Sequence, residues 1–557
     1  MSVKTKLVFG LGVALAPWLF AEPASAQDSD GLAPTAIVQL SSPQIVGGSG
    51  FSWVDAKIGA YLLATARLLP TGLGPASNPG IVVVDTTSLL VTNLLGSGTT
   101  STTTPFAGAC GNLGRPSPFE AFFGFNGPTG VTIVKRGQGK SLGNAEVWAS
   151  DGPIVSPPCP IDPNTGSPNQ FTGTISGNTL TVTVAPSYGT LKIGDTVVGL
   201  DASNTPNVAP HTTITGTASS NSGACTPSCT GTGTNTGTYA VSVAQSFPSE
   251  KMSAFNVTDP GARPSQVVVF DFKTGAISAI IPIKSGNTTG LYRANHLCYN
   301  ETYGVVLIAN DGDNFITFID AKTYQIIQII KFDGTDPDGN HILANGLEQC
   351  QFNPRDDNFY FNIPDSATGG HVVRISPKLT QPLQFHVEKD WNTADIKACA
   401  PTGLAVGPAT QLALGCDGTD GLIISDGTGA TPGGSTIVIL PGGGGIDEDW
   451  YNPGNNHYYF ANPSPGLLKA ADAGNLGTNG CTGAGCPAAD RPVPTGASSR
   501  SVAADSVANK VFVPIRAGRG TVCDTFGGST ANGCIAVYQG TNDGDDIDAG
   551  KKPIKGN

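Results

Sequence analysis

A pattern that recurs about every 45 to 55 residues constrains the fold of this chain more than any other feature. In each unit a polar pair is followed by three mostly apolar or small residues, a turn residue, and a strand-like run such as VVLIAN or HYYFAN. The clearest units start at residues 295–300, 348–353, 402–407, 447–452 and 500–505. This spacing suits one four-stranded propeller blade and is too long for most solenoid coils.

Two further units match the pattern more loosely, at residues 51–65 and 129–150, which brings the number to seven. A second motif follows the pattern: an apolar run ends in Asp, a short turn contains Thr or Ser, and a second apolar run follows. It occurs at residues 80–91, 266–281 and 315–330. Because an Asp side chain accepts backbone N–H groups in such turns, the motif predicts two antiparallel strands. We therefore predict an all-β, seven-bladed β-propeller.

The last unit supplies only three strands, so the ring needs a fourth strand from elsewhere. Residues 35–40, which precede the first complete unit, form an isolated strand-like run. Since a ring fold must pair its open edge, we expect this run to complete the seventh blade.

Several motifs are similar to those of known propeller families. The Asp-ending strand pairs, the segments NHLCYN and DEDWYNP, and the closing SVAADSVANKVFVP resemble the YVTN-type periplasmic propellers and the wider SMP-30/gluconolactonase-like group. The resemblance covers residues 35–150 and 262–540 and implies the architecture. It implies little about activity, because propellers of this kind include enzymes, binding proteins and scaffolds.

The second blade is interrupted by a stretch of different composition. Residues 153–264 are rich in Thr, Val and Gly and contain alternating runs such as GTISGNTLTVTV, which predict a small antiparallel β module. The propeller would then comprise residues 27–152 and 265–541, followed by a disordered tail at 542–557. The module is either an enlarged loop or a contact for adhesion or for a partner protein.

The first 26 residues have the layout of a signal peptide. Lys4 and Lys6 precede an apolar run at residues 7–20, and Ala24-Ser25-Ala26 forms an A-x-A cleavage site before Gln27. We expect cleavage near Ala26 and a secreted or periplasmic protein. No later segment has the length and composition of a membrane span.

The chain contains 12 cysteines, an even number that fits an oxidising compartment. Four pairs are close in sequence and are predicted to form disulfides: Cys225 with Cys229, Cys399 with Cys416, Cys481 with Cys486, and Cys523 with Cys534. Cys298 and Cys350 form either a disulfide between blades or two buried thiols. The pairing of Cys110 and Cys159 stays open.

Aligning the units places a polar residue at the start of most innermost strands, where a propeller has one end of its axis. These residues, with their polar neighbours, define the polar ring: Thr129, Asn295, His296, Glu348, Gln349, Thr402, Asp447, Glu448 and Arg500. We expect them to face a common site for a small molecule or a partner protein, with Thr129, Gln349, Thr402 and Arg500 contacting the ligand. Alternatively, these groups only hydrogen-bond to one another and to water.

The gluconolactonase-like resemblance implies a second possibility, a divalent-metal-dependent lactone or ester hydrolase. Asn295, Glu348 and Asp447 would then bind a cation such as Ca²⁺, with His296 or Glu448 as the catalytic base. Arg500 opposes a cation at the ring; it would instead pair with Asp447 or Glu448, or bind an anionic ligand. A nucleic-acid partner is not expected, because the net charge is −12 and the sequence has no basic stripe.

Overall fold

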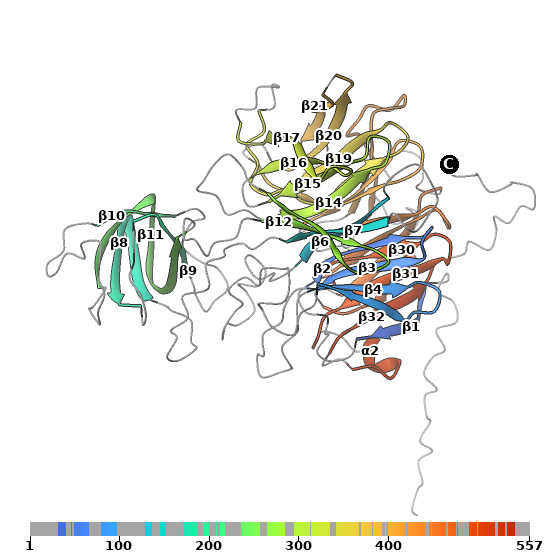
Figure 1. Cartoon of the computed structure of the whole chain (residues 1–557), viewed down its shortest axis with the longest axis horizontal. Coiled ribbons are helices and arrows are strands. Elements are labelled where there is room, and N and C mark those ends of the chain that lie inside the picture. Colours follow the sequence, from blue (N-terminus) through green and yellow to red (C-terminus); the bar gives the residue numbers. More distant parts are fainter. Residues whose placement is uncertain are drawn as a thin grey trace, which may run out of the picture.

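The computed structural model consists almost entirely of antiparallel strands (Figure 1). It describes residues 32–40, 46, 49–65, 80–96, 128–135, 145–151, 171–186, 191, 193–199, 208, 212–217, 236–256, 265–283, 294–311, 314–334, 341–366, 369–380, 382–392, 396, 399–417, 421–440, 445–446, 448–463, 466–474, 476, 490–497, 499–518, 522–529 and 532–540. The predicted signal peptide and C-terminal tail lie outside these ranges.

The described strands form eight four-stranded sheets, seven of which have the strand order of propeller blades. Blade 1 contains β2 (Ser49–Asp55), β3 (Ala60–Thr65), β4 (Gly80–Asp85) and β5 (Val91–Leu95). Blade 2 contains β6 (Pro128–Lys135), β7 (Ala145–Asp151), β12 (Gln266–Asp271) and β13 (Ile277–Pro282). Blade 3 contains β14 (Ala294–Asn300), β15 (Val305–Asn310), β16 (Phe315–Asp320) and β17 (Gln325–Lys331).

The remaining blades follow in chain order. Blade 4 contains β18 (Cys350–Asn353), β19 (Asn358–Ile363), β20 (His371–Lys378) and β21 (Gln384–Asn392). Blade 5 contains β22 (Pro401–Val406), β23 (Gln411–Cys416), β24 (Gly421–Ser425) and β25 (Thr436–Leu440). Blade 6 contains β26 (Glu448–Asn452), β27 (His457–Asn462), β28 (Leu467–Asp472) and β29 (Asp490–Pro494).

Blade 7 joins the two ends of the described chain. It contains β30 (Ala503–Asp505), β31 (Lys510–Ile515), β32 (Cys534–Gln539) and the N-terminal β1 (Ala33–Gln39), which pairs antiparallel with β32. This is the pairing that ring closure required of residues 35–40. A short helix, α2 (Val522–Thr525), lies between β31 and β32.

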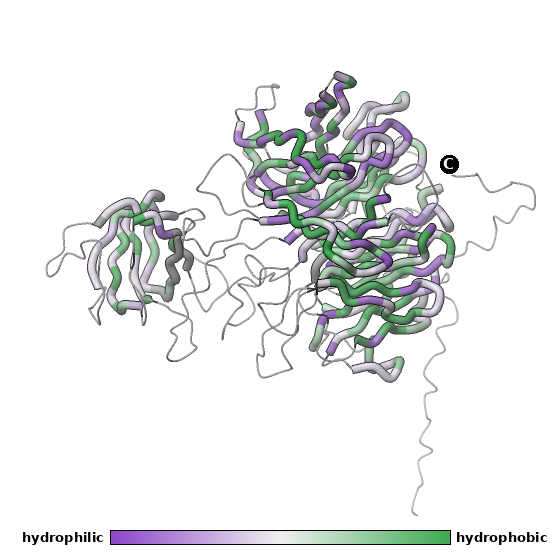
Figure 2. Tube along the Cα trace, viewed as in Figure 1, coloured by the Kyte–Doolittle hydropathy of each residue, from purple (hydrophilic) through white to green (hydrophobic). Residues whose placement is uncertain are grey.

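The seven sheets form a closed ring. The first strands of successive blades contact one another from β2 through β6, β14, β18, β22, β26 and β30, and β30 contacts β2 again. A separate hydrophobic core fills each space between neighbouring blades; between blades 3 and 4, for example, Phe318 packs on Phe359 and Phe385. Figure 2 shows hydrophobic residues along the strands and hydrophilic residues at many turns. The fold is therefore a β-propeller, as the repeat predicts.

The Asp turns between third and fourth strands have the predicted chemistry. The Oδ1 atom of Asp85 accepts the N–H groups of Thr87 and Ser88, and Asp271 and Asp320 accept equivalent bonds in blades 2 and 3. The N–H bond from Ser88 lowers the pKa of Asp85, and the hydroxyl and N–H of Thr274 lower that of Asp271, because these bonds stabilise the ionised carboxylate.

The eighth sheet lies in the chain between β7 and β12. Its central strand β11 (Gly237–Asn256) pairs with β8 (Phe171–Val184), β9 (Asp195–Gly199) and β10 (Ile214–Thr217), and the sheet has its own core. Since β7 and β12 pair directly with each other, blade 2 is complete without this sheet.

Candidate functional site

The polar ring lies at the axial end where the first strand of each blade begins. Its members come from the starts of β6, β14, β22 and β26 and from the segments just before β18 and β30. The ring of contacts between first strands brings these starts around one axis. Asp447 lies outside the described residues, and the other predicted members are described.

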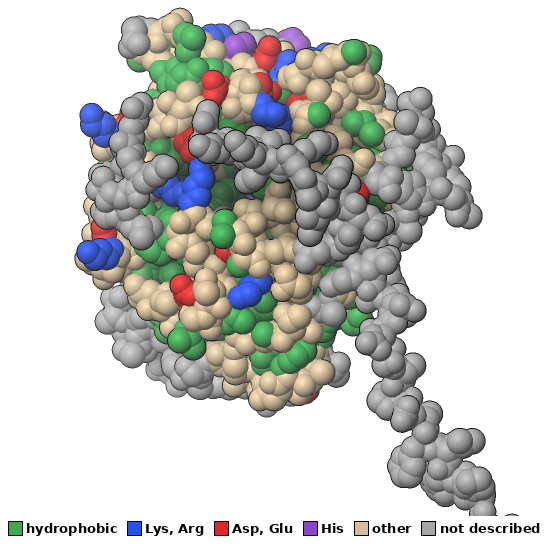
Figure 3. All heavy atoms as spheres, turned by 90° about the vertical axis from the view of Figure 1, so that its right-hand side faces the viewer, with side chains coloured by type: hydrophobic (Ala, Val, Ile, Leu, Met, Phe, Trp, Pro, Cys, Tyr) green, Lys and Arg blue, Asp and Glu red, His purple; other side chains and the backbone are tan. Residues whose placement is uncertain are grey.

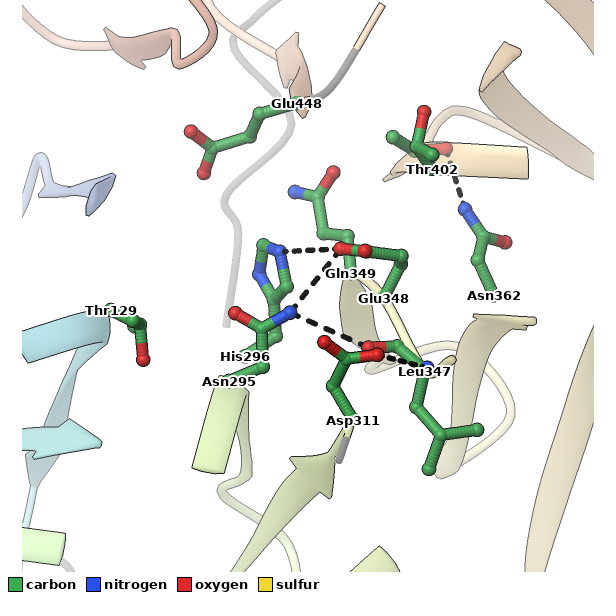
Figure 4. Close-up of polar contacts among 12 residues, drawn as sticks. Thr129, Asn295, His296, Asp311, Leu347, Glu348, Gln349, Asn362, Thr402 and Glu448 are labelled. Carbon is green, nitrogen blue, oxygen red and sulfur yellow. Dashed lines mark hydrogen bonds and ion pairs between the residues drawn. The ribbon is translucent and has the colours of Figure 1, made fainter. Parts of the chain in front are cut away.

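Asn295, His296 and Glu348 form the tightest group in the ring (Figure 4). The Glu348 Oε2 atom lies 3.3 Å from Asn295 Nδ2, which donates to it, and 3.7 Å from His296 Nε2. Asn295 and His296 are buried, whereas the Glu348 side chain is 19% exposed. Glu348 therefore connects this group to solvent.

The side-chain oxygen of Asn295 has no hydrogen-bond partner among the described residues, although Asn295 is 0% exposed. Its amide nitrogen points toward Glu348 and the Leu347 carbonyl, so the oxygen points the other way (Figure 4). A buried acceptor without a donor costs about 1–3 kcal/mol, and such an atom in a folded protein suggests an additional donor.

Phe51 covers the imidazole of His296 from across the axis. The two ring centroids are 3.3 Å apart, although Phe51 comes from β2 in blade 1 and His296 from β14 in blade 3. The contact buries His296, so the axis is packed with side chains at this point.

Thr129 anchors the start of β14. Its hydroxyl donates to the Ala294 carbonyl at 2.7 Å, and the neighbouring Ser150 hydroxyl donates to the Asn295 carbonyl. These bonds fix the backbone that carries Asn295 and His296.

Gln349 connects three blades through its side-chain amide. Its Oε1 atom accepts the N–H of Leu404 at 2.6 Å and that of Asp449 at 3.2 Å, and its Nε2 atom donates to the Asp449 carbonyl at 3.3 Å. Both ends of the amide are thus occupied by the backbone of blades 5 and 6.

Thr402 also bonds to the backbone, because its hydroxyl lies within reach of the Ile446 and Gly415 carbonyls. Glu448, at the start of β26 in blade 6, is buried, with Oε2 3.5 Å from the Ser52 N–H. Ser52 is in turn bonded to Ser501. Arg500 is partly buried at the start of blade 7.

The structure therefore brings together Asn295, His296 and Glu348 and places Glu448 elsewhere in the ring. No group of three or more His, Cys, Asp or Glu side chains in the described part of the chain could hold a metal ion. Of the three suggested metal ligands, Asn295 and Glu348 are neighbours and Asp447 is not described.

Sequence reasoning missed several buried polar residues at this end. Asn310, Asn362 and Asn462 each end or nearly end a second strand and are 0% exposed; Asn362, for example, donates to the Gly403 carbonyl at 2.7 Å. The repeated Asn in VVLIAN, NFYFNI and HYYFAN was a readable signal for these positions. Tyr61 is another buried polar residue that the sequence analysis missed, and burial raises its pKa.

The inserted sheet joins the propeller at the same axial end as the polar ring. Asp151, the last residue of β7, pairs with Pro128 at the start of β6 and with Gln266 at the start of β12. The Ser265 hydroxyl, at the second junction, accepts the N–H of Ala294 at 3.2 Å. The second junction is thus bonded directly to β14, the strand that carries Asn295.

Three disulfides are present in the described residues. Cys399–Cys416 and Cys523–Cys534 confirm two predicted pairs, and Cys298–Cys350 links β14 to β18 just below the ring. The other predicted pairs, Cys225–Cys229 and Cys481–Cys486, lie outside the described residues, as do Cys110 and Cys159.

Comparison with known proteins identifies no family for the chain. No protein-family model and no curated protein matches it. Among solved structures, one described as the crystal structure of mitotic checkpoint complex is similar at 9% identity with a TM-score of 0.46, covering 96% of this chain and 98% of that one. A β-propeller domain of Myceliophteria thermophila Cps50 (Swd1) is similar at 11% identity with a TM-score of 0.32, covering 47% of this chain and 76% of that one.

Proposed function

We propose that this chain is an exported β-propeller that binds a small molecule, or a donor group of a partner protein, at its polar ring. The observation that carries the proposal is the buried oxygen of Asn295, which has no partner among the described residues, in the same group as the partly exposed carboxylate of Glu348. Both atoms are hydrogen-bond acceptors. A ligand that supplies N–H or O–H donors, such as an amine or a polyol, fits them best.

Export is supported by two independent features. The N-terminal 26 residues have the layout of a signal peptide, and the described residues contain three disulfides. Disulfides persist mainly in oxidising compartments. No helix in the described ranges is both long and apolar enough to cross a membrane.

The repeated Asp turns and the N-terminal strand in blade 7 support membership of the YVTN-type or SMP-30/gluconolactonase-like propellers. We also propose the domain limits given above, with residues 153–264 as a module separate from the propeller. Figure 3 shows basic and acidic side chains interspersed on one face of the molecule.

Calcium is the alternative ligand, because a carboxylate and an amide oxygen are typical calcium ligands. The Asn295 oxygen points away from Glu348, so these two oxygens do not converge on one point, whereas calcium takes six or more oxygen ligands. The described geometry therefore favours a hydrogen-bonded organic ligand.

The test is isothermal titration calorimetry of the mature chain with putrescine, sorbitol and calcium chloride, each titrated separately. We expect binding of an organic probe and a loss of about tenfold in affinity for Glu348→Gln, since a hydrogen bond to a charged group contributes 1.5–3 kcal/mol. Glu301→Gln is the matched control, because Glu301 follows β14 at the opposite end of the same strand and is exposed. Equal weakening by both variants, or no binding of any probe, would contradict the proposal; calcium binding alone, lost in Glu348→Gln, would favour the alternative.

A further inference from the structure

Blade 4 contains a second polar cluster, formed by a serine, a histidine and an aspartate outside the ring. The Ser366 Oγ atom lies 3.1 Å from His371 Nε2, and His371 Nδ1 lies 3.2 Å from Asp390 Oδ2. Ser366 lies between β19 and β20, His371 begins β20, and Asp390 lies on β21. The β19–β20 connection and strands β20 and β21 thus bring a nucleophile, a base and a carboxylate together.

The aspartate determines how the imidazole can act. An ionised carboxylate accepts a hydrogen bond from Nδ1–H, so in this tautomer His371 presents the lone pair of Nε2 to Ser366. The hydrogen bond from His371 lowers the pKa of Asp390, which keeps this carboxylate ionised. This is the arrangement of nucleophile, base and orienting group that activates serine hydroxyls in unrelated folds.

The histidine is held in place and the serine is accessible. The His371 side chain is 3% exposed, and its position is fixed by pairing of β20 with β19 and β21. Ser366 is only partly buried. Its hydroxyl also lies 2.6 Å from the Gly369 carbonyl, so rotation about the C–O bond is enough to turn the proton toward His371.

A neighbouring segment, residues 343–345, lies beside Ser366. Ala344 forms a β-bridge with Ser366, and the preceding Leu343 is 53% exposed. Asn345, which follows, donates its side-chain amide to the exposed Asp365 at 3.1 Å, next to the serine.

We propose that Ser366, His371 and Asp390 form a nucleophilic site that hydrolyses short-chain esters. Ser366 Oγ would bond to the ester carbonyl carbon while its proton passes to His371 Nε2. The C–O bond to the alcohol then breaks, and His371 returns the proton to the leaving oxygen. Water repeats the same transfer on the acyl-serine, which releases the acid and restores the serine.

The site shares no residue with the polar ring, so the two proposals fail independently. The ring uses Asn295 and Glu348 in blade 3 and before β18, whereas this cluster uses side chains around β20. Ligand binding at the ring would be measured without any covalent chemistry.

The test is labelling of the full mature chain with a fluorophosphonate probe, with the adduct located by mass spectrometry. We expect one adduct on Ser366, its absence in Ser366→Ala, and a labelling rate about tenfold lower in Asp390→Asn, because the imidazole loses its orienting partner. The same variants should change hydrolysis of p-nitrophenyl acetate in parallel.

Ser376→Ala is the matched control, because Ser376 lies on the same strand and donates to Glu388 instead of a histidine. Its labelling should equal that of the unmodified chain. The proposal is overturned if folded protein, verified by circular dichroism, gives no adduct on Ser366 while a known serine esterase is labelled in the same tube. Equal labelling of the unmodified chain and Asp390→Asn would remove Asp390 from the site.

Discussion

Two buried amide side chains in the polar ring, Gln349 and Asn295, behave in opposite ways. The Gln349 amide is saturated by the backbone of Leu404 and Asp449, so it joins blades 4, 5 and 6. The Asn295 amide uses its nitrogen only, and its oxygen is buried without a partner.

Gln349 is therefore a polar side chain that stabilises the fold, whereas Asn295 has an oxygen that can accept a hydrogen bond from a ligand. Both residues occupy ring positions in the repeat, and the sequence offers no way to tell them apart. The difference arises because the Gln349 side chain is long enough to reach the backbone of Asp449, two blades away. The shorter Asn295 side chain reaches only Leu347 and Glu348, just before the next blade. Replacing each of the two amides by leucine tests this distinction.

The largest effect is expected for Gln349→Leu, which keeps the volume and removes the amide. The N–H groups of Leu404 and Asp449 would lose their buried acceptor. We expect the free energy of unfolding to fall by about 3 kcal/mol, since an unsatisfied buried donor costs 1–3 kcal/mol. Urea unfolding followed by tryptophan fluorescence measures the loss.

Ligand affinity at the ring should change little in this variant as long as it is folded. If the free energy of unfolding fell by less than about 0.5 kcal/mol, water would be replacing the Gln349 bonds, and Gln349 would not have the structural role assigned to it.

Much of the architecture was predictable because strand and turn signals are local. The Asp turns, the units that begin at residues 295 and 348, and the N-terminal strand follow from short motifs and from the need to close a ring. The contacts of the ring were not predictable, since they depend on side chains from different blades. Phe51 on His296 and Gln349 on Asp449 join residues 245 and 100 positions apart, respectively, and no local pattern encodes either contact.

An intermediate effect on stability is expected for Gly403→Ala, on the side of the ring where Gln349 bonds to the backbone of Leu404 and Asp449. A Cβ atom at Gly403 would meet the buried Asp449 carboxylate, with Cγ at 2.7 Å. Neither group can move freely, because Asp449 is 0% exposed and its backbone is held by Gln349. We expect a destabilisation of about 2 kcal/mol from overpacking, measured by urea unfolding.

Gly237→Ala provides the control for this substitution. Gly237 also lies in a strand, but a Cβ atom there would meet nothing within 4 Å. Stability should therefore stay within about 0.5 kcal/mol of the unmodified chain. Similar losses for the two variants would show that glycine is needed for the strands in general and not for the position of Asp449.

The smallest effect on stability is expected for Asn295→Leu, the counterpart of Gln349→Leu. The change removes two long hydrogen bonds, to Glu348 and to the Leu347 carbonyl, and also removes the unpartnered oxygen. Because both lost hydrogen bonds are long and the buried oxygen without a partner is removed with them, the free energy of unfolding should change by less than about 1 kcal/mol. Affinity for the organic ligand should nevertheless fall by about tenfold, since the ligand loses one acceptor. A variant that is destabilised as strongly as Gln349→Leu, with unchanged ligand affinity, would place Asn295 among the structural members of the ring.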